Sequence, residues 1–243
     1  MASVAHHYQS LLAPIYVWMA GGLDAAMARG QAEMDALGMR PTKSRLAVDL
    51  GAGFGMHTVP MADSGYSVLA LDNSATLLEI LRSQVGTRSI RIVNDDLMSF
   101  GRYVAGPVAI IVCMGDTLAH LPDLRSVEEL FAGVAQVLEE GGTFLMTFRD
   151  YSIPLEESDR FILVRSDADR ILTCFLEYEE KAVIVHDILH ERDGSGWRQR
   201  VSTYRKLRLS ADWVVCALES RGFHVRREVG MAGMTRVIAT RPG

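Results

Sequence analysis

The 243-residue sequence predicts a doubly wound α/β fold with a mostly parallel sheet, and two patterns carry this prediction. Short apolar runs typical of buried parallel strands alternate with amphipathic helical segments over residues 45–150. Between residues 160 and 209 the pattern changes to alternating apolar and polar residues, broken by turn sequences. That change predicts an antiparallel β-meander inserted into the α/β fold.

Composition and charge narrow the function classes. The net charge is −5, which argues against a nucleic-acid partner, because phosphate backbones attract basic surfaces. The three cysteines lie far apart and form neither a disulfide framework nor a zinc motif, so a cytoplasmic location is expected. The apolar run Leu11–Leu23 is interrupted by Pro14 and has no preceding lysine or arginine. We therefore expect neither a secretion signal nor a membrane span there.

The first predicted strand, Arg45–Val48, leads into a glycine-rich turn and then into a helix over Met56–Ala62. The turn reads Gly51-Ala52-Gly53-Phe54-Gly55, and Asp49 precedes it by two residues. Glycines at such a turn let the backbone approach a ligand closely, because no Cβ intervenes. A dinucleotide fingerprint would place its third glycine one residue later, where the chain has Met56.

Acidic residues follow the next two predicted strands. The strand Ser67–Asp72 ends in an acid about 20 residues beyond the glycines, where a ribose-binding carboxylate belongs. Asn73 and Ser74 also favour the start of the helix predicted over Thr76–Leu81. Asp72 is therefore alternatively the N-cap of that helix. The strand Ile90–Val93 is followed by Asp95, Asp96 and Leu97, and either acid fits a ligand site or a solvated turn.

The most apolar run, Val108–Cys113, predicts a central strand whose carboxyl end meets the ligand through Met114 and Gly115. His120 lies in the same loop and either takes a proton from a substrate or bonds a backbone group at a helix start. A helix is predicted over Ser126–Leu138, with a glycine cap in Glu139–Gly142 and a strand over Thr143–Phe148.

These segments, in this order, resemble the class I (Rossmann-like) S-adenosylmethionine-dependent methyltransferases. The resemblance rests on the acid before Gly-x-Gly-x-Gly, on the acids after the second and third strands, and on the passage LEEGGTFLMTF. Gly115-Asp116-x-x-x-His120-Leu121 and Arg149-Asp150-Tyr151 are further similar to the glycine N-methyltransferase-like branch. The resemblance implies a seven-stranded sheet with a C-terminal antiparallel hairpin strand, and S-adenosylmethionine as the cofactor.

The resemblance also implies roles for particular residues. The glycine turn would hold the methionine moiety, with Asp49 near its ammonium. Asp72 would bind the ribose, with the adjacent Asn73 as a further cofactor-side candidate, and Asp96 or Asp95 with Leu97 would bind the adenine. The remaining cofactor-side candidates, Met114 and Gly115, lie where methyl donor and acceptor meet. His120, Arg149 and Tyr151 are the acceptor-side candidates, with Arg149 holding a substrate carboxylate. Alternatively, Arg149 forms a structural bridge to Asp150 or Glu156.

The ends of the chain complete the predicted single domain. Residues 1–40 are expected to be helical, with breaks near Pro14 and Gly21, and to form a lid over the cofactor site or a helix packed on the sheet edge. His6 and His7 are expected in a frayed terminus. The insert 160–209 would roof the substrate pocket or form a dimer face, and its His186 and His190 are too few for a metal site. Residues 210–243 predict a last helix capped by Ser210 and a terminal strand pair.

Together these patterns predict a methyltransferase that acts on a small molecule, with a carboxylate-bearing amine as one acceptor class. Two alternatives remain open. A nicotinamide-dependent oxidoreductase would share the glycine turn and Asp72, and a non-catalytic S-adenosylmethionine-binding or scaffold protein would share the whole cofactor half. We expect no nucleic-acid or membrane partner, and a homodimer formed through the β insert.

Overall fold

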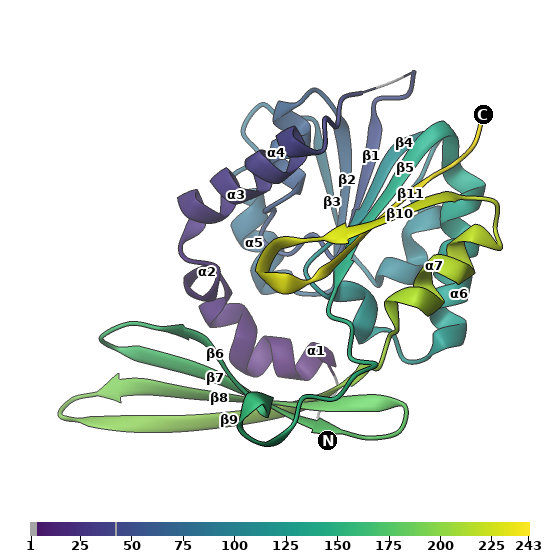
Figure 1. Cartoon of the computed structure of the whole chain (residues 1–243). Coiled ribbons are helices and arrows are strands. Elements are labelled where there is room, and N and C mark those ends of the chain that lie inside the picture. The colour runs from purple at the N-terminus through teal and green to yellow at the C-terminus, as the bar shows by residue number, and fades with distance from the viewer. Residues whose placement is uncertain (1–3, 42) are drawn as a thin grey trace.

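The strands form two separate sheets in the computed structural model, which describes residues 4–41 and 43–243 (Figure 1). The larger sheet has seven strands in the order β10-β11-β5-β4-β1-β2-β3. Their bounds are β1 (Leu46–Leu50), β2 (Ser67–Asp72), β3 (Ile90–Asn94), β4 (Val108–Cys113), β5 (Leu138–Phe148), β10 (His224–Val229) and β11 (Thr235–Thr240). Only β11 runs antiparallel to its neighbours, β5 and β10, among the strands of this sheet. The predicted mostly parallel sheet with a C-terminal hairpin strand is confirmed.

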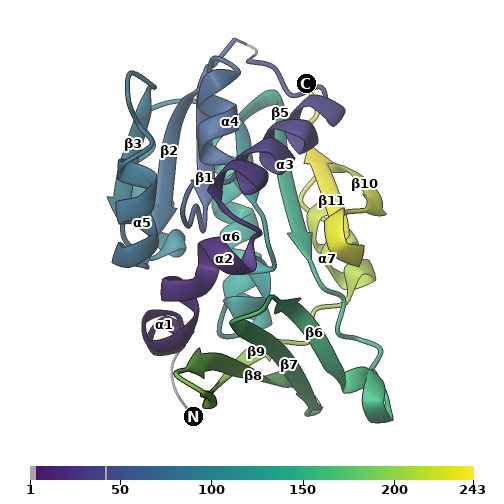
Figure 2. The ribbon, with the colours of Figure 1, turned by 90° about the vertical axis from the view of Figure 1, so that its left-hand side faces the viewer.

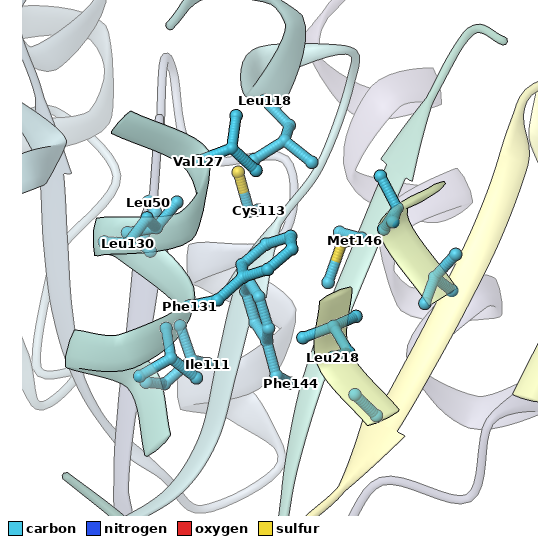
Figure 3. Close-up of a cluster of buried hydrophobic side chains, with 14 of the residues drawn as sticks. Leu50, Ile111, Cys113, Leu118, Val127, Leu130, Phe131, Phe144, Met146 and Leu218 are labelled. Atoms are coloured by element: carbon cyan, nitrogen blue, oxygen red, sulfur yellow. The ribbon is translucent and has the colours of Figure 1, made fainter. Parts of the chain in front are cut away.

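Helices cover both faces of this sheet, which confirms the doubly wound arrangement (Figure 2). The helices α3 (Leu23–Ala36), α4 (Thr58–Asp63) and α5 (Ala75–Arg82) lie on one face, and α6 (Leu124–Val137) and α7 (Ala211–Glu219) lie on the other. All six residues of β4 are buried, as its apolar run predicts for a central strand. Figure 3 shows the core between α6, α7 and the sheet, where the rings of Phe131 and Phe144 meet edge to face at 5.9 Å.

The predicted glycine cap after α6 is wrong. The helix ends at Val137, and Leu138 already belongs to β5, where it is buried and pairs with Val108 of β4. The register between these strands then shifts, and Gly141 adopts a φ of +76° within the strand. A Cβ on Gly142 would lie 2.8 Å from the carbonyl oxygen of Glu139. The two glycines therefore permit a strand irregularity, rather than a helix cap.

The smaller sheet is the predicted meander, in the order β6-β7-β8-β9, with each neighbouring pair antiparallel. Its strands are β6 (Phe161–Ser166), β7 (Arg170–Tyr178), β8 (Ala182–Asp193) and β9 (Gly196–Leu207). It lies below the larger sheet, with the N-terminal helices between the two (Figure 1). The prediction of an antiparallel insert between β5 and the last helix is confirmed.

The N-terminal segment is helical with breaks, as predicted, although residues 1–3 lie outside the described residues. It comprises α1 (Val4–His7), a π-helical turn (Tyr8–Leu12), a 3-10 turn (Ala13–Ile15), α2 (Tyr16–Met19) and α3. No single helix of the described residues is long and apolar enough to cross a membrane. The segments Tyr8–Met19 and Leu23–Ala36 reach that length and hydropathy only when taken together, and a bend of 74° separates them.

His7 does not lie in a frayed terminus, contrary to the sequence expectation. Its side chain is fully buried against the smaller sheet. The Nε2 atom lies 3.0 Å from a carboxylate oxygen of Asp187, and Nδ1 lies 2.6 Å from the hydroxyl of Ser202. These contacts, with Leu11 and Ile15 packed on Leu172 and Leu189, fasten the N-terminal segment to the insert.

Candidate active site

A cavity of about 580 Å³ lies at the carboxyl ends of β1, β2 and β4. Doubly wound folds bind ligands at this end of the sheet, and the volume is within the range of roughly 300–1,000 Å³ for small-molecule sites. The residues that line it are Val4, Tyr8, Tyr16, Gly51, Ala52, Gly53, Phe54, Met56, His57, Asp72, Asn73, Leu77, Asp96, Leu97, Met98, Met114, Gly115, Thr117, His120, Leu121, Pro122, Ser126 and Glu129. Ten of the fifteen residues singled out in the sequence are among them.

The glycine turn after β1 is held from behind by hydrogen bonds. The N–H groups of Gly51 and Ala52 both donate to the carbonyl of Leu71, at 2.9 Å each. The N–H of Gly53 donates to a carboxylate oxygen of Asp72 at 2.8 Å. A Cβ on Gly51 would lie 2.6 Å from the side chain of Thr117, and the φ of Gly51 is +79°. The turn therefore presents bare backbone to the cavity, while these three N–H groups bond within the protein.

Gly55 and Asp49 lie behind the turn, outside the cavity lining. The φ of Gly55 is +96°, and a Cβ there would lie 2.5 Å from Leu81 of α5, so this glycine permits the turn to pack on the helix. Asp49 is buried, and its carboxylate accepts a hydrogen bond from the hydroxyl of Thr58 at 2.6 Å. Burial raises the pKa of Asp49 above its usual range.

Asp72 lines the cavity beside Asn73. Its carboxylate accepts from the N–H of Ser74 at 2.7 Å as well as from Gly53. The N-cap of α5 is Ser74, whose hydroxyl accepts from the N–H of Leu77, so the alternative that Asp72 caps this helix is wrong. Burial raises the pKa of Asp72, which makes its carboxylate a stronger hydrogen-bond acceptor than a solvated one.

The structure separates the two neighbouring acids that follow β3. Asp96 and Leu97 line the cavity, whereas Asp95 does not. The carboxylate of Asp95 accepts from the hydroxyl of Tyr103 at 2.7 Å and from the N–H of Asp96 at 2.8 Å. The Asp96 side chain caps the 3-10 helix Leu97–Arg102, through the N–H of Met98. Asp95 is therefore engaged in shaping the turn, and Asp96 with Leu97 borders the cavity.

Met114 and Gly115 also border the cavity, and His120 ends the 3-10 helix Thr117–His120 beside them. The Nε2 atom of His120 lies 3.3 Å from the hydroxyl of Tyr8. Burial, reinforced by the nearby Lys206 ammonium, lowers the pKa of His120 to about 3. The imidazole is thus neutral at pH 7 and can exchange hydrogen bonds. It is too weakly basic to store a proton during a reaction at that pH.

Tyr8 and Tyr16 line the cavity and belong to the N-terminal segment for which a lid was one expectation, although neither tyrosine was assigned a role of its own. Their rings lie 5.9 Å apart, and Tyr16 meets Phe54 of the glycine turn at 6.0 Å. Burial raises the pKa of both phenols, so they remain neutral. Their helical spacing, which placed both tyrosines on one face of the N-terminal segment, was the available sequence signal.

Arg149 and Tyr151 do not line the cavity. The guanidinium of Arg149 lies 3.5 Å from the carbonyl oxygen of Ala232. Within residues 4–41 and 43–243, Arg149 forms no ion pair with Asp150 or Glu156, so the alternative of a structural bridge is wrong, and the acceptor-side role of Arg149 stays a prediction. Tyr151 is buried, and its hydroxyl donates to the carboxylate of Asp116 at 3.2 Å.

Asp116 and Lys206 form a buried ion pair behind His120 that sequence reasoning missed. Tyr204 precedes Lys206 by two residues on β9, and its ring stacks on that of His120 at 5.6 Å. Residues two apart on a strand share a face, so Lys206 lies on the same buried face of β9 as Tyr204. This spacing was the available sequence signal for a buried charge.

Residues 47–142 match a family model described as a methyltransferase domain. The glycine/sarcosine N-methyltransferase of Aphanothece halophytica is 23% identical over 117 residues, which cover 47% of this chain and 44% of that protein. The chain thus spans less than half the length of this curated relative. The crystal structure of Streptomyces venezuelae DesVI has a TM-score of 0.76 at 17% identity over 100% of both chains. The glycopeptide N-methyltransferase MtfA, solved with S-adenosylmethionine, has a TM-score of 0.61 at 25% identity over 88% of both chains.

The matched domain covers the glycine turn, Asp72, Asp96 and the loop that carries His120, which are the segments brought together at the cavity. The fold as a whole agrees with that of the structural neighbours, as the TM-score of 0.76 over 100% of both chains for DesVI shows. The resemblance found in the sequence is therefore confirmed: residues 47–142 match a methyltransferase domain, and the chain has the fold of solved S-adenosylmethionine-dependent methyltransferases.

Proposed function

We propose that this protein transfers a methyl group from S-adenosylmethionine to the amine nitrogen of a small-molecule acceptor. One observation carries the proposal: a single cavity is bordered by the cofactor-type segments and by the neutral pair Tyr8 and His120. The choice of nitrogen is supported by the related proteins, since the Aphanothece halophytica relative and MtfA are both described as N-methyltransferases.

The lining residues fit the parts of S-adenosylmethionine. Gly51 and Gly53 border the cavity without side chains, so the methionine moiety could approach the backbone there closely. Asp72 would hold the ribose hydroxyls, and Asp96 with the apolar Leu97 would hold the adenine. When bound, the cofactor supplies an electrophilic methyl group on a sulfonium sulfur.

Tyr8 and His120 would orient the acceptor. Their hydroxyl and Nε2 atoms lie 3.3 Å apart at the cavity, so an acceptor N–H beside this pair could bond to either group. Holding the amine in line with the methyl group supplies the orientation on which such displacements depend. Because the pKa of His120 is about 3, we infer that the acceptor reacts as a free amine and loses its proton to solvent.

The charges at the cavity favour an amine whose skeleton carries no carboxylate. The lining found in the described part of the chain includes the carboxylates of Asp72, Asp96 and Glu129 but no lysine or arginine. Arg149, the sequence candidate for a carboxylate partner, bonds to Ala232 instead. A carboxylate on the acceptor would therefore find no lysine or arginine of the described lining to pair with, which disfavours amino acids as acceptors.

The test begins with calorimetric titration of the protein with S-adenosylmethionine, S-adenosylhomocysteine and NAD. We expect micromolar binding of both adenosyl ligands, and binding of NAD alone would overturn the proposal in favour of an oxidoreductase. The second step measures S-adenosylhomocysteine formation with an amino sugar, a simple aliphatic amine, glycine and sarcosine. Turnover of the first two supports the acceptor class, turnover of glycine or sarcosine contradicts it, and binding without any turnover favours a non-catalytic role.

We also infer a homodimer formed through the insert, and a cytoplasmic location in keeping with the three free cysteines. Leu163, Thr173, Ile188 and Val201 form one row across the four strands of the smaller sheet. Leu163 and Val201 are 62% and 56% exposed, so a second copy could cover them. Sedimentation equilibrium of Val201→Glu should show a monomer, and an unchanged mass would contradict the inference.

A further inference from the structure

A lysine is buried inside the interface between the insert and the larger sheet. Lys206 of β9 is only 8% exposed, and its ammonium forms an ion pair with the carboxylate of Asp116. Asp116 follows β4 directly, so the pair joins two segments that are 90 positions apart in the sequence. Buried charges are rare and need a partner, because removing an ion from water is costly.

Asp116 bonds to three further backbone and side-chain groups. One carboxylate oxygen accepts from the N–H of Arg149 at 2.9 Å, and the other accepts from the hydroxyl of Tyr151 at 3.2 Å. Its own N–H donates to the carbonyl of Thr147 at 3.0 Å. Asp116 therefore links the end of β4 to the end of β5, and Lys206 adds β9 to the same junction.

The backbone at Asp116 turns the chain toward His120. Its φ is +73°, a left-handed conformation that costs a non-glycine residue on the order of 1 kcal/mol and persists where surrounding contacts enforce it. Asp116 is the N-cap of the 3-10 helix Thr117–His120, and its carbonyl accepts from the N–H of Ala119 at 3.2 Å. The direction of this short helix, and so the place of His120 at the cavity, depends on how Asp116 is held.

We propose that Lys206 is a positioning residue of the acceptor site, which holds Asp116 and thereby sets His120 against Tyr8 at the cavity. Lys206 does not line the cavity, so it acts through Asp116, rather than on the acceptor itself. That this part of the cavity binds the acceptor rests on the proposed function. The arrangement of Lys206, Asp116 and His120 is independent of it.

Electrostatics support this placement. Burial has the largest effect on the His120 pKa and lowers it, Lys206 and His7 lower it further, and Asp116 opposes them. Tyr8 and Tyr204, whose phenols remain neutral, complete the surroundings of the ring. Burial also opposes the charge on Lys206, but the Asp116 carboxylate outweighs it, so the pKa of Lys206 lies well above its ordinary value. The ammonium is therefore charged at neutral pH and disfavours protonation of His120.

Packing on the other side of His120 explains why the ring depends on this junction. Its Nδ1 atom is buried and has no hydrogen-bond partner within residues 4–41 and 43–243. The contacts that hold the ring are the stacked Tyr204 and the hydroxyl of Tyr8. Since Tyr204 and Lys206 share one face of β9, the same strand both supports the ring and fixes the loop that carries it.

The test follows the His120 imidazole by NMR in the ligand-free full-length protein, with its signals assigned by comparison with His120→Gln. In the wild type we expect His120 to stay neutral down to about pH 4, with a ring-to-ring nuclear Overhauser effect to Tyr8. In Lys206→Met the titration midpoint should rise by about one pH unit or more, and the Overhauser effect should weaken. Lys206→Arg should restore both readouts toward the wild type.

Arg205→Met is the matched control, because it removes a charge from the adjacent, exposed position of the same strand and should change neither readout. If Lys206→Met does not fold, the Asp116→Asn/Lys206→Met protein, which has no unpaired buried charge, decides the question through the same Overhauser effect. An unchanged His120 signal in either folded variant would overturn the proposal. Because the test uses neither S-adenosylmethionine nor an acceptor, its outcome is separate from that of the proposed function.

Discussion

The carboxylate of Asp72 accepts a hydrogen bond from the N–H of Gly53 at 2.8 Å. The acid at the end of β2 thus holds the glycine turn that follows β1, while the same side chain borders the cavity. Shape of the turn and recognition of a ribose would therefore depend on one residue. This coupling makes the choice of substitution important when Asp72 is tested.

Asp72→Asn should weaken binding of S-adenosylhomocysteine by about 10- to 100-fold. A lost hydrogen bond to a charged group is worth about 1.5–3 kcal/mol, and an amide keeps one acceptor oxygen for Gly53. Calorimetry measures the change, and Asp95→Asn serves as the control outside the cavity, where binding should stay within twofold. Equal losses in the two variants would contradict the assignment of Asp72 to the ribose.

Gly51→Ala should destabilise the protein more than Gly53→Ala. Both positions have positive φ, which costs an alanine roughly 1–2 kcal/mol. A Cβ on Gly51 would in addition lie 2.6 Å from Thr117, whereas on Gly53 its nearest neighbour would be Leu77 at 3.8 Å. We expect losses of about 3 and about 1 kcal/mol, measured by urea unfolding. Losses of equal size would show that the contact with Thr117 relaxes freely.

Stability should fall between pH 7 and pH 5 partly because of His120. The folded pKa of about 3 lies below the usual value near 6.5, so the unfolded chain binds the proton in this window and the folded chain does not. The stability due to the neutral ring is complete above pH 6.5 and is lost progressively as the pH falls toward 3. Wild type should lose about 1–2 kcal/mol more than His120→Gln from pH 7 to pH 5. Urea unfolding at pH 7 and pH 5 measures this difference. An equal loss of unfolding free energy in the two proteins would refute the prediction.

A second buried network should matter for stability. Glu33 of α3 accepts from Arg236 of β11 at 2.9 Å and lies 3.1 Å from the Nε2 atom of His57. Burial alone would raise the pKa of Glu33, but His57 and Arg236 outweigh it, so the pKa is lowered and the carboxylate stays charged. Arg236→Met should therefore cost about 3 kcal/mol.

The matched control for that network is Arg226→Met, which removes an exposed arginine paired with Glu228. Surface pairs of this kind contribute at most about 1 kcal/mol, so the free energy of unfolding should barely change. Thermal and urea unfolding of both variants give the comparison. If Arg236→Met is as mild as Arg226→Met, the Glu33 carboxylate is compensated by His57 alone.

Much of the fold follows from local sequence patterns. The predicted bounds of Ser67–Asp72 and Val108–Cys113 coincide with β2 and β4, because short apolar runs between turn residues are typical of buried parallel strands. The four strands of the insert follow from alternation, and Ser210 caps α7 as expected from its residue type. The glycine turn and Asp72, which the resemblance assigned to one cofactor, lie together because the carboxyl ends of the adjacent parallel strands β1 and β2 meet.

The choice between neighbouring residues required the tertiary structure. Asp95 and Asp96 have the same chemistry in the sequence, and only the contact of Asp95 with Tyr103 shows which acid is left to border the cavity. The glycines after α6 read as a helix cap, yet Leu138 is drawn into β5 by its pairing with β4. Pairing with a distant strand overrides a local capping signal, because it satisfies the backbone and buries Leu138 together.

The sequence by itself determined the order of the elements, the cofactor-type turn and the acids that follow the strands, because these depend on periodicity and residue type over a few positions. Only the tertiary structure decided that Tyr8 faces His120, that His7 is buried on Asp187, and that Lys206 pairs with Asp116. Such contacts join residues 90 or more positions apart, and their chemistry depends on how fully each group is withdrawn from water. Burial of that kind is set by the packing of the insert and the N-terminal segment against the sheet, which no local pattern specifies.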